Sequence, residues 1–213
     1  MTLLNKDEVF YYAATGRASL NTGIAIQKIK DVERSTFLKY LSMDLYYAME
    51  DDLIDYSSTT AYSNSTAYTT GALVKYNGII YKATASTTGN MPVVDSAFWT
   101  EADKFDTDCL QLLWVEIRRW LCLTVLKTVL PSTAIQLDDK GLVERSGQDF
   151  QSVSTAKYNL FIQGINEDIT LCWANFKEWM DNKTTCDYAP YLIKCINIEI
   201  NTPISGQRIP IIF

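Results

Sequence analysis

A short stretch in the first half of the chain has the pattern of a small β module set between two helical segments. Residues 61–102 contain brief runs of β-branched and aromatic side chains separated by glycines, whereas the flanking segments repeat apolar residues at helical spacing. The pair Asn77-Gly78 predicts a two-residue hairpin turn, because both central positions of a type I′ turn need positive φ. We therefore expect a helical host interrupted by a β unit in which residues 74–76 pair antiparallel with residues 79–82.

A two-stranded ribbon is only marginally stable by itself in water, so other residues must pack over this hairpin. Pro92 and the pair Phe98-Trp99 are predicted to do so. The aromatic side chains of the module have two interpretations, an internal core or a platform on which a sugar ring stacks. We favour the core and keep as the alternative a glycan contact made by Tyr62, Tyr76 and Trp99.

The module contains a regular pattern of aromatic, glycine and proline residues: Tyr68-x-x-Gly71-x-x-Val74, Gly78-x-x-Tyr81-x-Ala83, Gly89-x-x-Pro92 and a closing Trp99. This spacing resembles that of the chitin-binding type 3 carbohydrate-binding modules. Members of that family usually carry exposed aromatic residues just after the Tyr-x-Ala element, where this chain has Thr84, Ala85, Ser86 and Thr87. The resemblance therefore implies the fold of the module more than it implies sugar binding.

The composition argues for a globular protein without a histidine-based active site. Of the 213 residues, 47% are hydrophobic and 21% are charged, which allows one sizeable core and a small satellite. The chain has no histidine, so Ser-His and Cys-His nucleophiles and histidine-ligated metals are excluded. Carboxylates such as Asp51, Asp52 and Asp55 fit solvated helix ends and turns better than an acid–base pair. We expect no enzyme and no cofactor.

The net charge and the number and spacing of the cysteines further restrict the class of protein. The net charge is −6 and no lysine or arginine cluster forms the basic stripe that tight nucleic-acid binding needs. The five cysteines are odd in number and form no Cys-x-x-Cys pair, which predicts reduced core residues. The first residues lack the pattern of a secretory signal, and charged residues interrupt the apolar segment 110–130. We expect assembly in a cytoplasm and no membrane span.

The host segments predict three or four helices. A short helix is expected over residues 6–15, a longer one over 22–52, and an apolar one over 107–129 that Pro131 stops. A hairpin or loop is expected over 137–150, and a last helix begins after Ser152 or Ser154 and ends near Asn182. The predicted fold class is α+β, mainly helical. The expected units are a helical core (1–59 and 104–185), an inserted β module (60–103) and an extended C-terminal tail (186–213).

Two features predict contact with other chains. The segment 107–129 is apolar nearly all round, more than a host of this size would readily cover, which favours burial between subunits. The residues predicted for this interface are Leu113, Trp114, Ile117, Trp120 and Leu121.

In the tail, isoleucines alternate with polar residues as in a strand without a hairpin partner, a pattern suited to adding to the sheet edge of a neighbour. Packing against the chain's own helices is the alternative. The tail residues predicted to bind the neighbour are Ile196, Ile198, Ile200, Ile209, Ile211 and Phe213.

The host elements follow one another in the order LLNKDEVFYYA, IQKIKDVERSTFLKYLSMDLYYAM, an apolar helix, KGLVERSGQDFQSVS and YNLFIQGINEDITLCWANFKEWMDN. This order resembles the head-tail connector proteins of tailed bacteriophages, in particular those of the crAss-like group. The chain departs from that family at Ser42, where a glycine is common, and in carrying the inserted module.

The resemblance implies a homo-oligomeric ring, usually twelvefold, at the head-tail junction of a virion. Such a ring binds the portal protein and other tail or ring proteins, and it lets DNA pass without sequence-specific binding. The acidity of the chain fits a channel wall that repels phosphates. The alternative function is attachment to a cell-surface polysaccharide through the inserted module.

Overall fold

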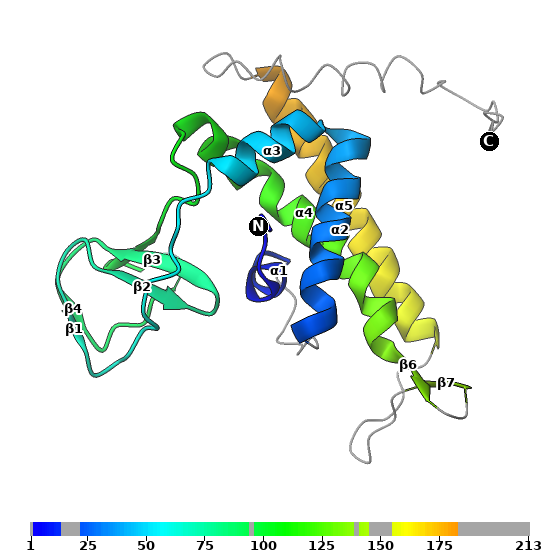
Figure 1. Cartoon of the computed structure of the whole chain (residues 1–213), viewed down its shortest axis with the longest axis horizontal. Coiled ribbons are helices and arrows are strands. Elements are labelled where there is room, and N and C mark those ends of the chain that lie inside the picture. The colour runs from blue at the N-terminus through cyan, green and yellow to red at the C-terminus, as the bar shows by residue number, and fades with distance from the viewer. Residues whose placement is uncertain (1, 14–21, 94–95, 139–140, 145–154, 183–213) are drawn as a thin grey trace.

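The computed structural model describes residues 2–13, 22–93, 96–138, 141–144 and 155–182, and it has the predicted α+β fold. Figure 1 shows a small β module beside a layer of long helices, with a short helix between them. The described helices are α1 (Lys6–Tyr12), α2 (Thr22–Tyr40), α3 (Met43–Asp51), α4 (Asp108–Ala134) and α5 (Thr155–Asn182). The described strands are β1 (Ala67–Tyr68), β2 (Leu73–Tyr76), β3 (Ile79–Ala83), β4 (Thr87–Thr88), β5 (Trp99–Glu101), β6 (Ile135–Asp138) and β7 (Gly141–Glu144).

The predicted hairpin is confirmed. Strand β2 pairs antiparallel with β3, with Tyr76 opposite Ile79, and the turn residues Asn77 and Gly78 have φ values of 51° and 82°. Strand β5 adds to the free side of β3, where Trp99 lies opposite Ala83. The closing role predicted for Trp99 is therefore confirmed by its place in a three-stranded sheet.

This sheet has one buried and one exposed face, because successive side chains of a strand point to opposite sides. The buried face gathers five side chains into the core of the module, namely Val74, Ile79, Tyr81, Ala83 and Trp99. The outer face presents Leu73, Lys75, Lys82 and Thr100 to solvent.

The prediction of one helix over residues 22–52 is wrong, because the chain breaks between α2 and α3. Ser42 has φ −147° and ψ 153°, and its hydroxyl oxygen accepts a hydrogen bond from the backbone N–H of Leu45 at 3.0 Å. A serine in this conformation caps a new helix, whereas it would weaken the interior of a continuous one. Ser42 thus begins α3 and changes the direction of the chain (Figure 1).

The predicted stop at Pro131 is also wrong, since α4 continues to Ala134 and leads directly into the hairpin of β6 and β7. A proline removes one backbone donor and tends to kink a helix, but it need not end it. The predicted hairpin begins two residues earlier than expected, and residues 139–140 and 145–154 lie outside the described part. Helix α5 is described from Thr155 to Asn182, and the residues after Asn182 lie outside the described part.

Helix α4 is the centre of the helical core. It packs against α1, α2 and α5, and α5 runs back antiparallel beside it (Figure 1). Aromatic contacts join these helices, including Trp120 with Trp173 at 4.7 Å between ring centroids and Tyr40 with Trp120 at 5.6 Å. The apolar pattern of residues 107–129 therefore reflects a helix covered on several sides within one chain.

The predictions about cysteines and about membrane spans can also be compared with the structure. Cys122 and Cys172 are free thiols, but Cys109 is disulfide-bonded, so the prediction that all five cysteines are reduced is wrong. In the described part of the chain, none of the helices has the length and apolar character needed to cross a membrane.

Candidate functional site

The two connections between helical core and module run side by side as a neck. Leu53 and Phe105 form an antiparallel bridge, and the backbone N–H of Ile54 donates to the carbonyl oxygen of Lys104 at 3.0 Å. Asp52 accepts hydrogen bonds from the backbone N–H of Thr107 at 2.9 Å and from its hydroxyl at 2.8 Å. The chain thus leaves and re-enters the helical core at one point, and Asp52 has a structural role at that point.

Helix α1 lies between the module and the core and contacts both. Asn5 caps it: its side-chain oxygen accepts from the backbone N–H groups of Asp7 and Glu8, and the Glu8 carboxylate accepts from the backbone N–H of Asn5 at 2.7 Å. The remaining side-chain donor of Asn5 reaches the carbonyl oxygen of Gly78, 3.0 Å away in the hairpin turn. One asparagine therefore starts the helix and fixes the module against it.

A second contact joins α1, the sheet and α4 through a partly buried polar network. The Tyr12 hydroxyl donates to the Glu101 carboxylate, and Arg118 donates to Glu101 at 2.7 Å and to the Tyr12 oxygen at 3.2 Å. The Arg118 guanidinium also lies over the Tyr12 ring, 4.3 Å from its centroid. Burial, and then the Glu101 charge, raise the pKa of the Tyr12 phenol well above its ordinary value. Tyr12 therefore acts as a hydrogen-bond donor and not as a base.

Two more pairs complete this interface. The Tyr11 and Tyr81 hydroxyls lie 2.9 Å apart, so one donates to the other. The Lys104 ammonium pairs with the buried Glu8 carboxylate at 2.5 Å and lies 4.7 Å from the centroid of the Trp114 ring. Removing either member of such a buried pair leaves an uncompensated charge, so these contacts hold the module in one orientation.

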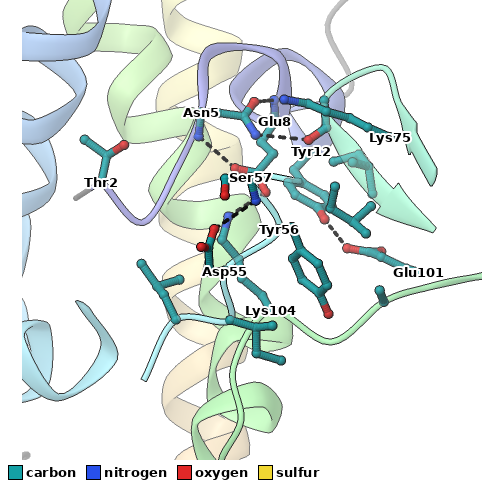
Figure 2. A pocket seen from close by; sticks show the side chains of 16 residues that line it. Thr2, Asn5, Glu8, Tyr12, Asp55, Tyr56, Ser57, Lys75, Glu101 and Lys104 are labelled. Atoms are coloured by element: carbon teal, nitrogen blue, oxygen red, sulfur yellow. Dashed lines mark hydrogen bonds and ion pairs between the residues drawn. The ribbon is translucent and has the colours of Figure 1, made fainter. Parts of the chain in front are cut away.

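A cavity of about 250 Å³ remains between α1, the neck and the sheet. Figure 2 shows that polar side chains of all three regions point into it, and that several are joined to one another. Its ionic pairs Glu8–Lys104 and Glu101–Arg118 are satisfied within the protein, and Asp55 accepts from the backbone N–H of Ser57 at 2.8 Å. This hydrogen bond lowers the pKa of the Asp55 carboxyl. The polar groups that line the cavity therefore join the module to α1 and to the helical core.

The segment before α1 is held by a buried carboxylate. Glu33 of α2 is 0% exposed, and its two oxygens accept hydrogen bonds from the backbone N–H groups of Leu3 at 3.1 Å and Leu4 at 2.7 Å. The Tyr46 hydroxyl donates to it at 3.4 Å. Burial raises the pKa of Glu33 to about 7, although the two backbone hydrogen bonds oppose the shift. Glu33 therefore positions α1, and through α1 the module.

The three residues predicted for glycan contact lie together: Trp99 belongs to the buried core of the module, and Tyr62 and Tyr76 are partly buried against that core. Trp99 is 3% exposed and donates from its ring N–H to the carbonyl oxygen of Asn90 at 2.8 Å. The Tyr62 ring contacts Tyr68, Tyr76 and Trp99, with centroids 5.7 to 6.0 Å apart. The Tyr62 hydroxyl is buried and has no hydrogen-bond partner among the described residues. The glycan prediction is wrong for Trp99, because a buried ring cannot stack on a sugar.

The five residues predicted as a subunit interface are buried inside the protomer. None is more than 2% exposed, because each packs into the core that α4 shares with its neighbours: Leu113, Trp114, Ile117, Trp120 and Leu121. The prediction is therefore wrong for these side chains. Among the α4 side chains whose burial the structure describes, the large apolar ones that remain exposed are Leu112 at 43% and Val115 at 44%.

These two side chains lie about one turn apart on the exposed side of α4. The exposed ion pair Arg119–Asp168, at 3.5 Å, joins α4 to the antiparallel helix α5. We refer to Leu112 and Val115 as the helix patch.

The tail residues Ile196, Ile198, Ile200, Ile209, Ile211 and Phe213 lie outside the described part of the chain, so their role stays a prediction. Within the described residues, no group of three Cys, Asp or Glu side chains could hold a metal ion.

Sequence reasoning missed the residues that join the two units. One signal was readable: Asn5-x-x-Glu8 is a capping box ahead of an apolar helix. A second was Arg118, a charge inside a segment that is apolar nearly all round, which needs a buried partner. Neither signal identifies the partner, because Gly78 and Glu101 lie far away in the sequence.

No family model, no curated protein and no solved structure matches this chain. The candidate site is therefore defined by the contacts, burial and charges of its own residues.

Proposed function

We propose that this protein is a structural subunit of a ring that connects the head and tail of a tailed bacteriophage. The ring lies beneath the portal in the virion, continues the DNA channel and gives tail components a surface on which to dock. The work of such a subunit is assembly and requires no reaction. The helical order described from the sequence supports this proposal, as does the largely helical core in which α4 and α5 run antiparallel (Figure 1).

The observation that carries the proposal is the helix patch. Single exposed leucines are ordinary on protein surfaces, but neighbouring exposed apolar side chains with a polar rim are typical of protein–protein contacts. Leu112 and Val115 form such a pair, and the exposed charged residues Asp108, Glu116 and Arg119 flank it on α4. Covering this patch with another subunit would remove apolar surface from water.

The fixed position of the module supports the same proposal. A ring needs subunits whose surfaces keep a constant angle, because each contact must repeat until the circle closes. The networks around Asn5, Tyr12 and Glu8 join the module to α1 and α4 at several points. The glycan-binding alternative has less support, since the rings it needs pack against one another.

Analytical ultracentrifugation of the full chain, alone and mixed with the portal protein of its phage, tests the proposal. We expect a concentration-dependent oligomer or a complex with the portal. The variant Val115→Asp should stay folded by circular dichroism yet fail to assemble, because a charge in an apolar contact is costly to bury. Thr128→Asp adds the same charge at an exposed position of the same helix and should assemble normally. Monomer under every condition would contradict the proposal.

A further inference from the structure

The outer face of the three-stranded sheet is basic and partly apolar. It carries Leu73, 40% exposed, together with the exposed Lys82 and Lys75, and Lys75 also lines the cavity that contains Asp55. The register places Lys82 opposite both Leu73 and Thr100, so the leucine and one lysine lie side by side. The strand residues that share this face include no carboxylate, and all of them belong to the described chain. We call this surface the module face.

The helix patch has the opposite charge. Asp108, Leu112, Val115 and Glu116 are all exposed and lie at steps of four, three and one residues along α4. This spacing puts the four side chains on one side of the helix, with the two acidic groups at the ends of the apolar pair. The helix patch is thus apolar in the middle with Asp108 and Glu116 at its ends, while the exposed Arg119, one turn beyond Val115, pairs with Asp168 of α5 at 3.5 Å.

Both surfaces are exposed in the single chain, so neither covers the other within a protomer. Two copies that each carry a net charge of −6 repel one another overall, and contact is favoured where local charges are opposite. We propose that the module face of one subunit docks on the helix patch of the next copy of this chain. This inference rests on the proposed ring, and it names the two surfaces that meet.

Such a contact is heterologous, because it uses two different surfaces of the same subunit. Heterologous contacts generate rings when the rotation between copies closes, and open filaments when it does not. Arg118, Glu101 and Tyr12 fix the angle between the module and α4, and that angle sets the rotation. The contact places Leu73 against Leu112 and Val115, and the two lysines against Asp108 and Glu116.

A charge-swap experiment on the full chain tests this pairing. Three variants are compared by size-exclusion chromatography with light scattering: Lys75→Glu with Lys82→Glu, Asp108→Lys with Glu116→Lys, and all four changes together. We expect each one-sided reversal to weaken association on the order of tenfold or more, and the combined variant to restore it. Lys127→Glu reverses an exposed charge elsewhere on α4 and should leave association unchanged. Circular dichroism confirms that every variant is folded.

The outcomes separate this inference from the proposed function. If the wild-type chain assembles but the one-sided reversals have no effect, or the combined variant fails to recover, the pairing is overturned while the ring proposal stands. If the wild-type chain assembles neither alone nor with the portal protein, both are overturned. Raising the salt concentration should weaken wild-type association, because exposed charge pairs are screened.

Discussion

Gly78 lets the module approach α1 because it has no side chain. Its φ of 82° is costly for any other residue, and a Cβ there would collide with Asp7 and press on the side-chain oxygen of Asn5. Gly78→Ala should therefore destabilise the protein by the cost of the positive φ, about 1 kcal/mol, plus an overpacking cost of about 1–3 kcal/mol. Urea denaturation followed by tryptophan fluorescence measures the loss.

Gly71 is the matched control for this change. Its φ is 87°, nearly the same as that of Gly78, but a Cβ at Gly71 would meet no atom within 4 Å. Gly71→Ala should therefore lower the free energy of unfolding only by the cost of the positive φ, about 1 kcal/mol. Equal losses for the two alanine variants would show that the hairpin turn does not rest on α1.

Glu33 makes stability depend on pH in an unusual direction for a carboxyl group. Its folded pKa of about 7 lies above the ordinary value of 4.5, so the folded state binds more protons than the unfolded state between these values. The stabilisation from this group is complete below about pH 4.5 and is lost as the pH rises through about 7. The shift corresponds to about 3 kcal/mol at most.

Denaturant titrations at several pH values compare the wild type with Glu33→Gln, which cannot titrate. Because Asp55 has a lowered pKa, its contribution has the opposite sign and should be common to both proteins. The wild type should lose stability relative to the variant as the pH rises from about 4.5 to 7.5. A difference that stays constant across this range would contradict the buried, proton-binding state of Glu33.

At the residue scale, the sequence predicted what depends on neighbours along the chain. Asn77-Gly78 forms its turn because the turn needs only those two residues to accept positive φ. The role of Glu33 could not be predicted, because its partners lie about 30 residues earlier, in the segment before α1. A buried carboxylate and an exposed one look alike until the fold places backbone donors beside one of them.

At the scale of elements, the module is closed at its neck but not independent of its host. The paired connections around Leu53 and Phe105 allow residues 60–103 to be replaced by a short Gly/Ser linker. The shortened chain should remain helical by circular dichroism. It should melt several degrees lower than the full chain, because Arg118 loses Glu101 and the tyrosines of α1 lose their cover.

Arg118→Met separates these two causes. In the full chain this change removes a partner of Glu101 and should be destabilising, whereas in the shortened chain it removes an unpaired charge and should cost less. The melting temperatures of the four proteins give the coupling. If Arg118→Met has the same effect in both backgrounds, the network does not join the module to the core.

The sequence predicted element boundaries correctly where the residue pattern changes along the chain. It predicted them incorrectly where one residue fits two different local structures. The boundary between β2 and β3 falls at Asn77-Gly78, where the turn signal placed it. Ser42 fits a helix interior or a cap equally well by composition, and the cap prevailed because its hydroxyl satisfies a backbone donor of α3. Pro131 similarly removes one backbone hydrogen-bond donor, but the helix continues past it to Ala134.

At the scale of the whole molecule, the apolar pattern of residues 107–129 predicted that other elements must cover α4. The pattern did not identify those elements. Trp114 and Ile117 are buried by α1, α2 and α5 of the same chain, while Leu112 and Val115 remain exposed on another side of the helix. Sequence alone cannot assign these sides, because a helix that is apolar nearly all round has no distinct inner face. The predicted interface on this helix was therefore placed on side chains that form its own core.

The central claim is that copies of this chain assemble into a closed ring. Electron microscopy of the full chain, alone and with the portal protein of its phage, tests it most directly. Two-dimensional class averages should show closed rings with one cyclic symmetry, in which the β modules form regularly spaced features joined to neighbouring helices. Averages that show only single subunits, or open filaments without closure, would contradict the account.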